Sequence, residues 1–258
     1  MRKHSFIKIL IFLFCLTFTF SIYADTVSQE EKVAKAFEVH KSTLSDDLKK
    51  IYETFKELIT YKLNFDNIAC GFIYLNDKNK NLLIGGSGAV YCGHTMGEAE
   101  LEKYGFDVVG FGGIFDYEVC DLLERITDKK YKNIVLFGGI NDLNIRAANK
   151  IKNVDELYCN TLVEFYYKAK EYLLDDNSNI IYIKINPMKY KQDSDDKEFI
   201  DRFNNMAMQI NMNLENFNYK PYTIKYDSTK EYSEIYMHYN NKVVYRDMFE
   251  AINSGNFE

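Results

Sequence analysis

Short runs of apolar residues alternate with longer segments of helical periodicity along most of the chain. The apolar runs are Phe72–Leu75, Leu82–Ile84, Val108–Val109, Ile134–Phe137, Ile180–Ile185 and Tyr222–Ile224. Apolar residues recur every three or four positions in Tyr117–Ile126, Val154–Leu174, Phe199–Leu214 and Lys242–Ile252. Fully apolar strands separated by amphipathic helices are typical of a parallel sheet that helices cover on both faces. The pattern therefore predicts a three-layer α/β domain with about five principal parallel strands.

Two segments precede this alternation. Residues Met1–Ala24 begin with basic side chains, continue as an apolar run and end at a small residue, which is the pattern of a cleaved signal peptide. The apolar run is short for a membrane-spanning helix. We therefore expect export to the exterior or the cell envelope, with no membrane span after cleavage. Residues 25–66 carry apolar positions at helical spacing and predict amphipathic helices, so the α/β domain is expected over residues 67–258.

The composition and the cysteine content limit the classes of partner and cofactor that the chain could bind. The chain has 258 residues, 47% of them hydrophobic, and a net charge of −6. This acidic balance argues against nucleic acid as the main partner, because phosphate binding needs a basic face. The cysteines after the signal peptide are Cys70, Cys92, Cys120 and Cys159, and both disulfides and buried free thiols remain open for them. The chain has no C-x-x-C and few histidines, so we expect neither a metal site nor a cofactor.

The candidate catalytic residues lie where the apolar runs end. Leu82–Ile84 is followed by the turn Gly85-Gly86-Ser87-Gly88, and a serine between small residues at a strand-to-helix turn has an approachable hydroxyl. Gly112 and Gly113 follow the next run and offer backbone N–H groups to an anion. Asn141 follows the run after that. Because the carboxyl ends of parallel strands meet at one edge of the sheet, these groups are expected to share a site.

His238, just before the last helical segment, completes a hydrolytic set. Ser87 would attack a carbonyl carbon, and His238 would take its proton and return it to the leaving group. The N–H groups of Ser87 and of Gly112 or Gly113, with the Asn141 amide, would hold the developing oxyanion. Each residue alone also fits a structural role, as a turn residue, a helix cap or a surface histidine. Their coincidence at one sheet edge favours a site.

The order of these motifs resembles that of the SGNH/GDSL hydrolases. The four blocks are matched by Gly85-Gly86-Ser87, Gly112-Gly113, Gly139-Ile140-Asn141-Asp142 and Met237-His238-Tyr239. The segment Ile183–Pro187 is similar to the fourth-strand segment of bacterial members, and the resemblance covers roughly Leu82 to Ile252. It implies a flavodoxin-like fold and metal-free esterase, lipase or carbohydrate O-deacetylase chemistry. The expected substrate is an acylated small molecule or glycan.

Two positions depart from the family pattern. The family has an aspartate before the serine, where this chain has Gly86, and another three residues before the histidine, where it has Ile235. An apolar side chain cannot orient an imidazole as the triad aspartate does. The candidates to replace that aspartate are Glu234, Glu231 and Asp227, or a backbone carbonyl. The sequence thus predicts a secreted serine esterase. The alternative is a catalytically degenerate member that binds a glycan or partner without turnover.

Two further features allow other interpretations. The stretch Gly86–Tyr91 begins like a dinucleotide-binding G-x-G-x-x-G, but Tyr91 replaces the third glycine. Asp107 lies near the place of a ribose-binding acid, although it precedes its strand. The tyrosines around His238 fit a sugar-binding surface and a packed core equally well; they are Tyr232, Tyr236, Tyr239 and Tyr245.

Overall fold

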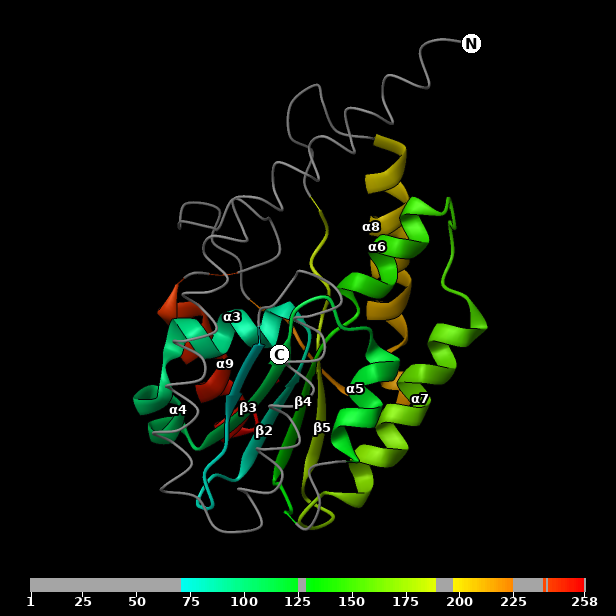
Figure 1. Ribbon diagram of the computed structural model, residues 1–258. Coiled ribbons are helices and arrows are strands. Elements are labelled where there is room, and N and C mark those ends of the chain that lie inside the picture. The colour runs from blue at the N-terminus through cyan, green and yellow to red at the C-terminus, as the bar shows by residue number, and fades with distance from the viewer. Residues whose placement is uncertain (1–70, 125–128, 189–196, 225–238, 240, 258) are drawn as a thin grey trace, which may run out of the picture. The chain divides into compact units, whose positions relative to one another are not determined.

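A six-stranded sheet forms the centre of the described chain (Figure 1). The structure is a computed structural model that describes residues 71–124, 129–188, 197–224, 239 and 241–257. The strands are β1 (Gly71–Tyr74), β2 (Asn81–Gly85), β3 (Phe106–Phe111), β4 (Asn133–Phe137), β5 (Asn179–Ile183) and β6 (Lys220–Tyr222). They lie in the order β1-β3-β2-β4-β5-β6, and all pairs are parallel except β1 with β3. The predicted parallel sheet is confirmed, with β1 as an antiparallel edge strand.

Helices cover both faces of this sheet (Figure 1). One face carries α3 (Ser87–Met96), α4 (Glu98–Tyr104) and α9 (Lys242–Ser254). The other carries α5 (Asp116–Leu123), α6 (Ile140–Ala148), α7 (Glu156–Glu171) and α8 (Lys197–Asn213), and a short 3-10 helix, η1 (Glu215–Phe217), precedes β6. The three-layer α/β architecture expected from the sequence is therefore confirmed, and α5, α7, α8 and α9 fall on the predicted helical segments.

Burial explains the apolar runs that mark the central strands. Every residue of β2, β3 and β4 is buried, because helices pack on both sides of them. The few polar side chains in these strands are paired. Asn133 Nδ2 donates to Asn81 Oδ1 at 2.8 Å, and Asn179 Nδ2 donates to Asn133 Oδ1 at 2.9 Å. This ladder joins the first residues of β2, β4 and β5 and holds their register at the amino ends of the strands.

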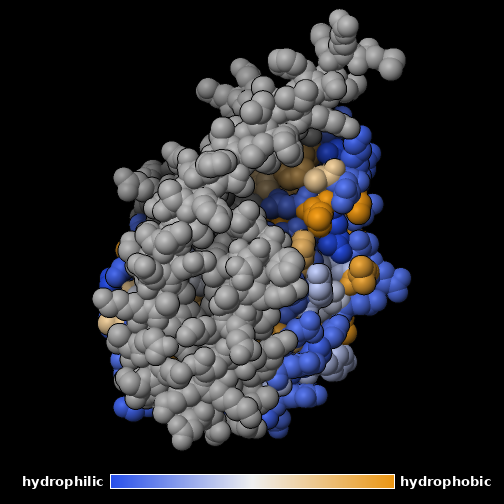
Figure 2. Space-filling view, viewed as in Figure 1, coloured by the Kyte–Doolittle hydropathy of each residue, from blue (hydrophilic) through white to orange (hydrophobic). Residues whose placement is uncertain are grey.

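The outer surface of the helices is mainly hydrophilic. On the flank that α6 and α7 form, blue side chains dominate and hydrophobic ones are scattered (Figure 2). Large exposed apolar side chains on these helices are Ile145, Leu157 and Tyr167. Single exposed apolar residues of this kind are ordinary on a folded protein. In the described part of the chain, no helix combines the length and hydrophobicity that crossing a bilayer requires.

The cysteines that the structure describes are free thiols. Cys92 and Cys120 are buried, and Cys159 is partly buried. For these three the free-thiol interpretation holds, and they behave as small apolar side chains. Cys70 lies outside the described residues, as do the predicted signal peptide and the predicted N-terminal helical segment with its boundary at residue 67.

Burial also bears on the two other interpretations of the sequence, for the residues that the structure describes. Asp107 was predicted to precede its strand, but it is the second residue of β3, because the strand begins before the apolar run. It is fully buried at the amino end of the strand, where its carboxylate accepts hydrogen bonds from Lys129 and Tyr131. This carboxylate is thus occupied inside the protein and is not available to a ribose. Tyr239 and Tyr245 are 5% and 0% exposed and belong to the hydrophobic core. The other two tyrosines of that group lie outside the described residues.

Candidate active site

Ser87 is the first residue of α3 and follows β2 after a single residue, Gly86. The turn lies tightly against the end of β4. A Cβ at Gly85 would lie 2.2 Å from the carbonyl oxygen of Phe137, and one at Gly88 would lie 2.6 Å from the Phe137 ring. Both distances are too short for any side chain, so these positions require glycine. The close approach holds the partly buried Ser87 at the carboxyl edge of the sheet.

Gly86 differs from these neighbours, which gives a first prediction. Its φ is −80°, and a Cβ there would meet its nearest atoms at 3.7–3.8 Å. We expect Gly86→Ala to fold with a Tm at or above that of the natural chain, because alanine restricts the unfolded state by about 0.4–1 kcal/mol. The matched control, Gly88→Ala, is expected to lower the Tm, because its new methyl group meets the Phe137 ring. Thermal unfolding followed by circular dichroism measures both, and an equal loss in the two variants would contradict the expectation.

Asn141 is the second residue of α6, whose N-cap is Gly139. This cap has a φ of +83°, and because the cap is Gly139, Asn141 and Asp142 lie in the first turn of the helix and do not cap it. Asn141 Nδ2 donates to the carbonyl oxygen of Ile114 at 2.9 Å. The same nitrogen would lie 3.8 Å from a Cβ built on Gly86. The amide, which has a second N–H to donate, therefore lies across from the residue before Ser87.

Ser87 and Asn141 line one cleft at the carboxyl ends of β2 and β4. The cleft encloses about 200 Å³, in part open to solvent. Its other lining residues are Gly86, Gly88, Ile114, Phe137, Gly138, Gly139 and Ile140. The structure thus brings together two residues that are far apart in the sequence, as expected from their places after parallel strands. The apolar walls Ile114, Phe137 and Ile140 were not anticipated, because nothing in a sequence marks an apolar residue as lining a cleft.

Gly112 and Gly113 lie in the turn between β3 and α5. Gly113 is exposed with a φ of +74°. Neither glycine is among the residues that line the cleft around Ser87. The same turn reaches the cleft through Ile114, whose carbonyl oxygen binds Asn141. The oxyanion-binding role of these glycines stays a prediction. His238 and its candidate orienting carboxylates, Glu234, Glu231 and Asp227, lie outside the described residues, as does Ile235.

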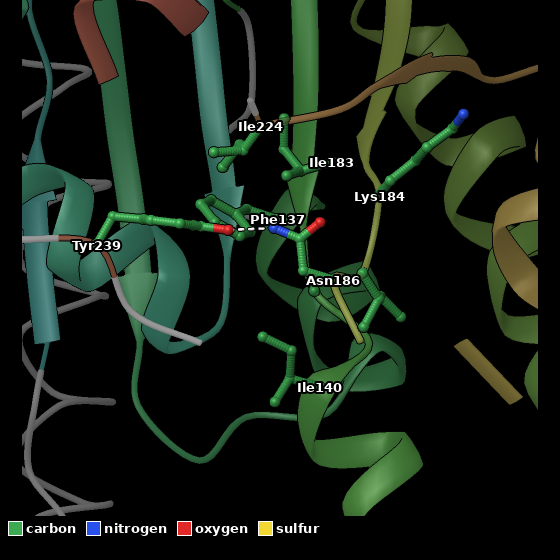
Figure 3. A pocket seen from close by; sticks show the side chains of 9 residues that line it. Phe137, Ile140, Ile183, Lys184, Asn186, Ile224 and Tyr239 are labelled. Carbon is green, nitrogen blue, oxygen red and sulfur yellow. Dashed lines mark hydrogen bonds between the residues drawn. The ribbon is translucent and has the colours of Figure 1, made fainter. Parts of the chain in front are cut away.

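A second hollow, of about 310 Å³, adjoins this cleft (Figure 3). Phe137, Gly138 and Ile140 line both. In Figure 3 the Tyr239 side chain reaches across the hollow toward Asn186, which donates a hydrogen bond from Nδ2 to the Tyr239 hydroxyl. Asn186 belongs to the Ile183–Pro187 segment of the sequence, and Tyr239 belongs to the Met237-His238-Tyr239 motif. The hydrogen bond therefore joins these two motif segments beside the cleft.

Two buried carboxyl groups lie behind the turn that leads to Asn141. Asp116, the first residue of α5, and Asp142 of α6 are 1% and 4% exposed. Burial raises the pKa of Asp116 to about 6. Burial, and secondly the charge of Asp116, raise the pKa of Asp142 to about 7. Sequence reasoning did not single out Asp116. Among the described residues, no group of three acidic, histidine or cysteine side chains is placed to hold a metal ion.

Comparison with known proteins gives structural likeness without sequence likeness. No family model matches the chain, and no curated protein matches it. A crystal structure of a GDSL-like lipase from Bacteroides thetaiotaomicron matches with a TM-score of 0.52 and 12% identity, over 78% of this chain and 96% of that one. A putative GDSL-like lipase from Parabacteroides merdae matches with a TM-score of 0.46 and 17% identity, over 70% and 98% of the two chains.

The first of these likenesses, with a TM-score above 0.5, concerns the fold and not the chemistry, because identity is low. It agrees with the observed sheet, in which helices cover both faces and the motif residues follow successive parallel strands. The protein therefore has an SGNH/GDSL-like hydrolase fold.

Proposed function

We propose that this protein is an exported serine esterase of SGNH/GDSL type, with Ser87 as nucleophile and His238 as general base. One observation carries the proposal. Ser87 and Asn141 line the same cleft at the carboxyl edge of the sheet, in a fold of this type. A nucleophile and a side-chain N–H donor at one cleft are the elements that acyl transfer requires.

In the proposed reaction, Ser87 Oγ attacks the ester carbonyl carbon as His238 removes its proton. The tetrahedral intermediate collapses when the imidazolium returns that proton to the departing alcohol, leaving the acyl group on Ser87. Water then attacks the acyl-enzyme with His238 again as base, which releases the acid and restores the serine. Glu234, Glu231, Asp227 or a backbone carbonyl would orient the imidazole in place of the missing aspartate at position 235.

The oxyanion would be held by groups at the ends of two helices. Asn141 has a second N–H beyond the one that binds Ile114. At the start of α3, the N–H groups of Ala89 and Val90 are the first to bond back to the carbonyl of Gly86. The N–H groups of Ser87 and Gly88 therefore precede the helical ladder, at the positive end of the helix dipole. Both features support an oxyanion site in this cleft, because each offers partial positive charge from N–H groups.

The cleft favours a short acyl group. Its apolar walls are Ile114, Phe137 and Ile140, and its free space of about 200 Å³ includes the part that is open to solvent. An acetyl group suits this space better than a long acyl chain does. With export predicted from residues 1–24, an O-acetylated extracellular glycan or small molecule is the proposed substrate class.

The test is turnover combined with labelling of the nucleophile. We expect the purified protein to hydrolyse p-nitrophenyl acetate faster than p-nitrophenyl octanoate. A fluorophosphonate, which forms a covalent bond with activated serines, is expected to modify the peptide containing Ser87, as mass spectrometry would show. Modification of another serine would remove Ser87 as the nucleophile, and a lack of both turnover and modification would refute the esterase. Binding of acetylated glycans without turnover would instead support the non-catalytic alternative.

Replacing Asn141 with alanine is expected to lower kcat by about a hundredfold. Loss of one oxyanion donor costs about 3 kcal/mol of barrier, while ground-state binding of the ester depends less on this contact. Steady-state kinetics with p-nitrophenyl acetate would measure kcat and KM separately. Asn144→Ala, on the same helix but outside the cleft lining, is the matched control and is expected to keep the natural kcat. A similar kcat for the two variants would remove Asn141 from the proposed mechanism.

A further inference from the structure

We propose that Asp116 is a positioning residue, whose carboxyl group fixes the Gly138-Gly139 turn and through it the amide of Asn141, which lines the cleft together with Ser87. The inference rests on the proposed function and deepens it. The inference adds Asp116, which lies outside the four motif blocks and is buried behind the cleft. Asp116 does not line the cleft and is not proposed to touch the substrate.

Asp116 is in direct contact with the turn. The backbone N–H of Gly139 donates to Asp116 Oδ1 at 2.8 Å. A Cβ at Gly138 would lie 2.0 Å from the same oxygen. The carboxyl group thus lies against both peptide units of the turn, and the left-handed φ of +83° at Gly139 directs the chain from there into α6. Asn141 follows two residues later, so the path of the turn sets the position of its amide.

Asp116 is itself held from other elements. The hydroxyl of Tyr158, on α7, donates to Asp116 Oδ2 at 2.8 Å and lies 3.1 Å from the hydroxyl of Tyr182, on β5. The backbone N–H of Asp116 donates to Asp142 Oδ2 at 3.0 Å, and Arg146 lies 3.6 Å from Asp142 Oδ1. Both tyrosines are fully buried. The network joins α5, α6, α7 and β5 around one turn, which is more than the packing of a single helix end requires.

Loss of this acceptor has a definite consequence. The N–H of Gly139 would be left buried without its partner, and a buried unpaired donor drives the backbone to rearrange. A rearranged turn displaces Asn141 from the oxyanion. Because a misplacement of about 1 Å is enough to cost about a hundredfold in rate, we expect the effect in kcat and little change in KM.

The kinetic test compares Asp116→Ala with the conservative Asp116→Asn. Asparagine keeps an oxygen that accepts from Gly139, and its amide N–H groups meet the hydroxyl of Tyr158, which also accepts hydrogen bonds. At a temperature where every variant is folded, Asp116→Ala is expected to lose about 10- to 100-fold in kcat for p-nitrophenyl acetate, with KM unchanged, while Asp116→Asn retains most of it. A kcat equal to that of the natural chain in Asp116→Ala would overturn the proposal.

Asp107→Ala is the matched control. This carboxylate is also fully buried and hydrogen-bonded, to Asn79 and Tyr131 among others, but at the amino ends of the strands. It is expected to lower the Tm without lowering kcat in the folded protein. An equal loss of kcat in the two alanine variants would show that only general stability is involved. Should Asp116→Ala fail to fold, Tyr158→Phe, which removes the donor to Oδ2, is expected to show a smaller loss in kcat, and an unchanged kcat would overturn the proposal.

A second readout does not depend on turnover. In nuclear magnetic resonance spectra, Asp116→Ala is expected to lose hydrogen-exchange protection at the Gly139 amide and to shift the side-chain amide signals of Asn141. Asp116→Asn is expected to keep both. If the natural protein hydrolyses no ester, the proposed function fails, whereas these signals still decide the positioning role. Unchanged protection and unchanged signals in Asp116→Ala would overturn it.

The pH dependence of stability is a third readout. The groups that face Asp116 are Asp142 and Arg146 on α6, Tyr158 on α7, Tyr182 on β5 and Tyr219 before β6. The pKa values of Asp116 and Asp142, about 6 and about 7, lie above the ordinary value of 3.8. Between these limits the two carboxyl groups hold more protons in the folded protein than in the unfolded chain, so their contribution to stability, and with it the Tm, is expected to fall as pH rises through this range. Asp116→Asn is expected to make the fall of Tm with pH less steep. An unchanged slope would contradict the burial of the Asp116 carboxyl group in this network, on which the proposal rests.

Discussion

Replacing Ser87 with alanine is expected to reduce ester hydrolysis to the rate of buffer alone and to leave the fold intact. In serine hydrolases, loss of the nucleophile removes up to about a millionfold in kcat, because no other group forms the acyl-enzyme. Ser87 is partly buried at the first position of α3, where alanine is a good helix former. Hydrolysis of p-nitrophenyl acetate, with circular dichroism to establish folding, measures both parts of the expectation.

The matched control is Ser178→Ala. Ser178 lies in the exposed turn before β5, at the amino end of the strand, where its hydroxyl bonds with Asp175. That variant is expected to keep the natural rate. Equal rates for Ser87→Ala and the natural chain would remove Ser87 from the mechanism, even if the protein proved to be an esterase through another residue.

Replacing Gly139 with alanine is expected to destabilise the protein more than a methyl group added at Gly86 or Gly88 would. The residue has a φ of +83°, which L-residues adopt at a cost of about 1–2 kcal/mol. A Cβ there would also lie 2.4 Å from Tyr182 Oη, 2.6 Å from Ile185 Cδ1 and 2.7 Å from Tyr158 Oη. Crowding of this kind adds about 1–3 kcal/mol. Together they predict a fall in Tm of about 10 °C, measured by calorimetry.

Gly255→Ala separates the two causes. Gly255 has a φ of +73° at the end of α9, and a Cβ there would have no atom within 4 Å. It therefore carries the conformational cost without the crowding and is expected to lose only about 1–2 kcal/mol. If the two variants lost the same stability, the crowded site around Gly139 would have to be yielding rather than rigid, contrary to its close contacts with the two buried tyrosines.

The predicted elements that the structure confirms are those with a strong local signal. The strands β2, β4 and β5 are continuous apolar runs because both faces of the sheet are covered. The helices α7, α8 and α9 are amphipathic, with one face on the core. By contrast, a helix was expected after Ser87 but the extent of α3 was not predicted, because the helix is buried on most sides and contains Gly88 and Gly93, so its periodicity is weak. Both glycines are needed for packing, since side chains there would meet Phe137 and Phe72.

The sequence by itself determined that Ser87 and Asn141 each follow an apolar strand, and parallel pairing then places both at one edge of the sheet. Only the tertiary structure decided which groups hold them there. Asp116, Tyr158 and Tyr182 lie on three separate elements, and nothing in their local patterns marks them as partners. Local periodicity reports which face of an element is buried. Which polar groups meet inside is decided by contacts between distant segments, and these depend on the packing of the whole domain.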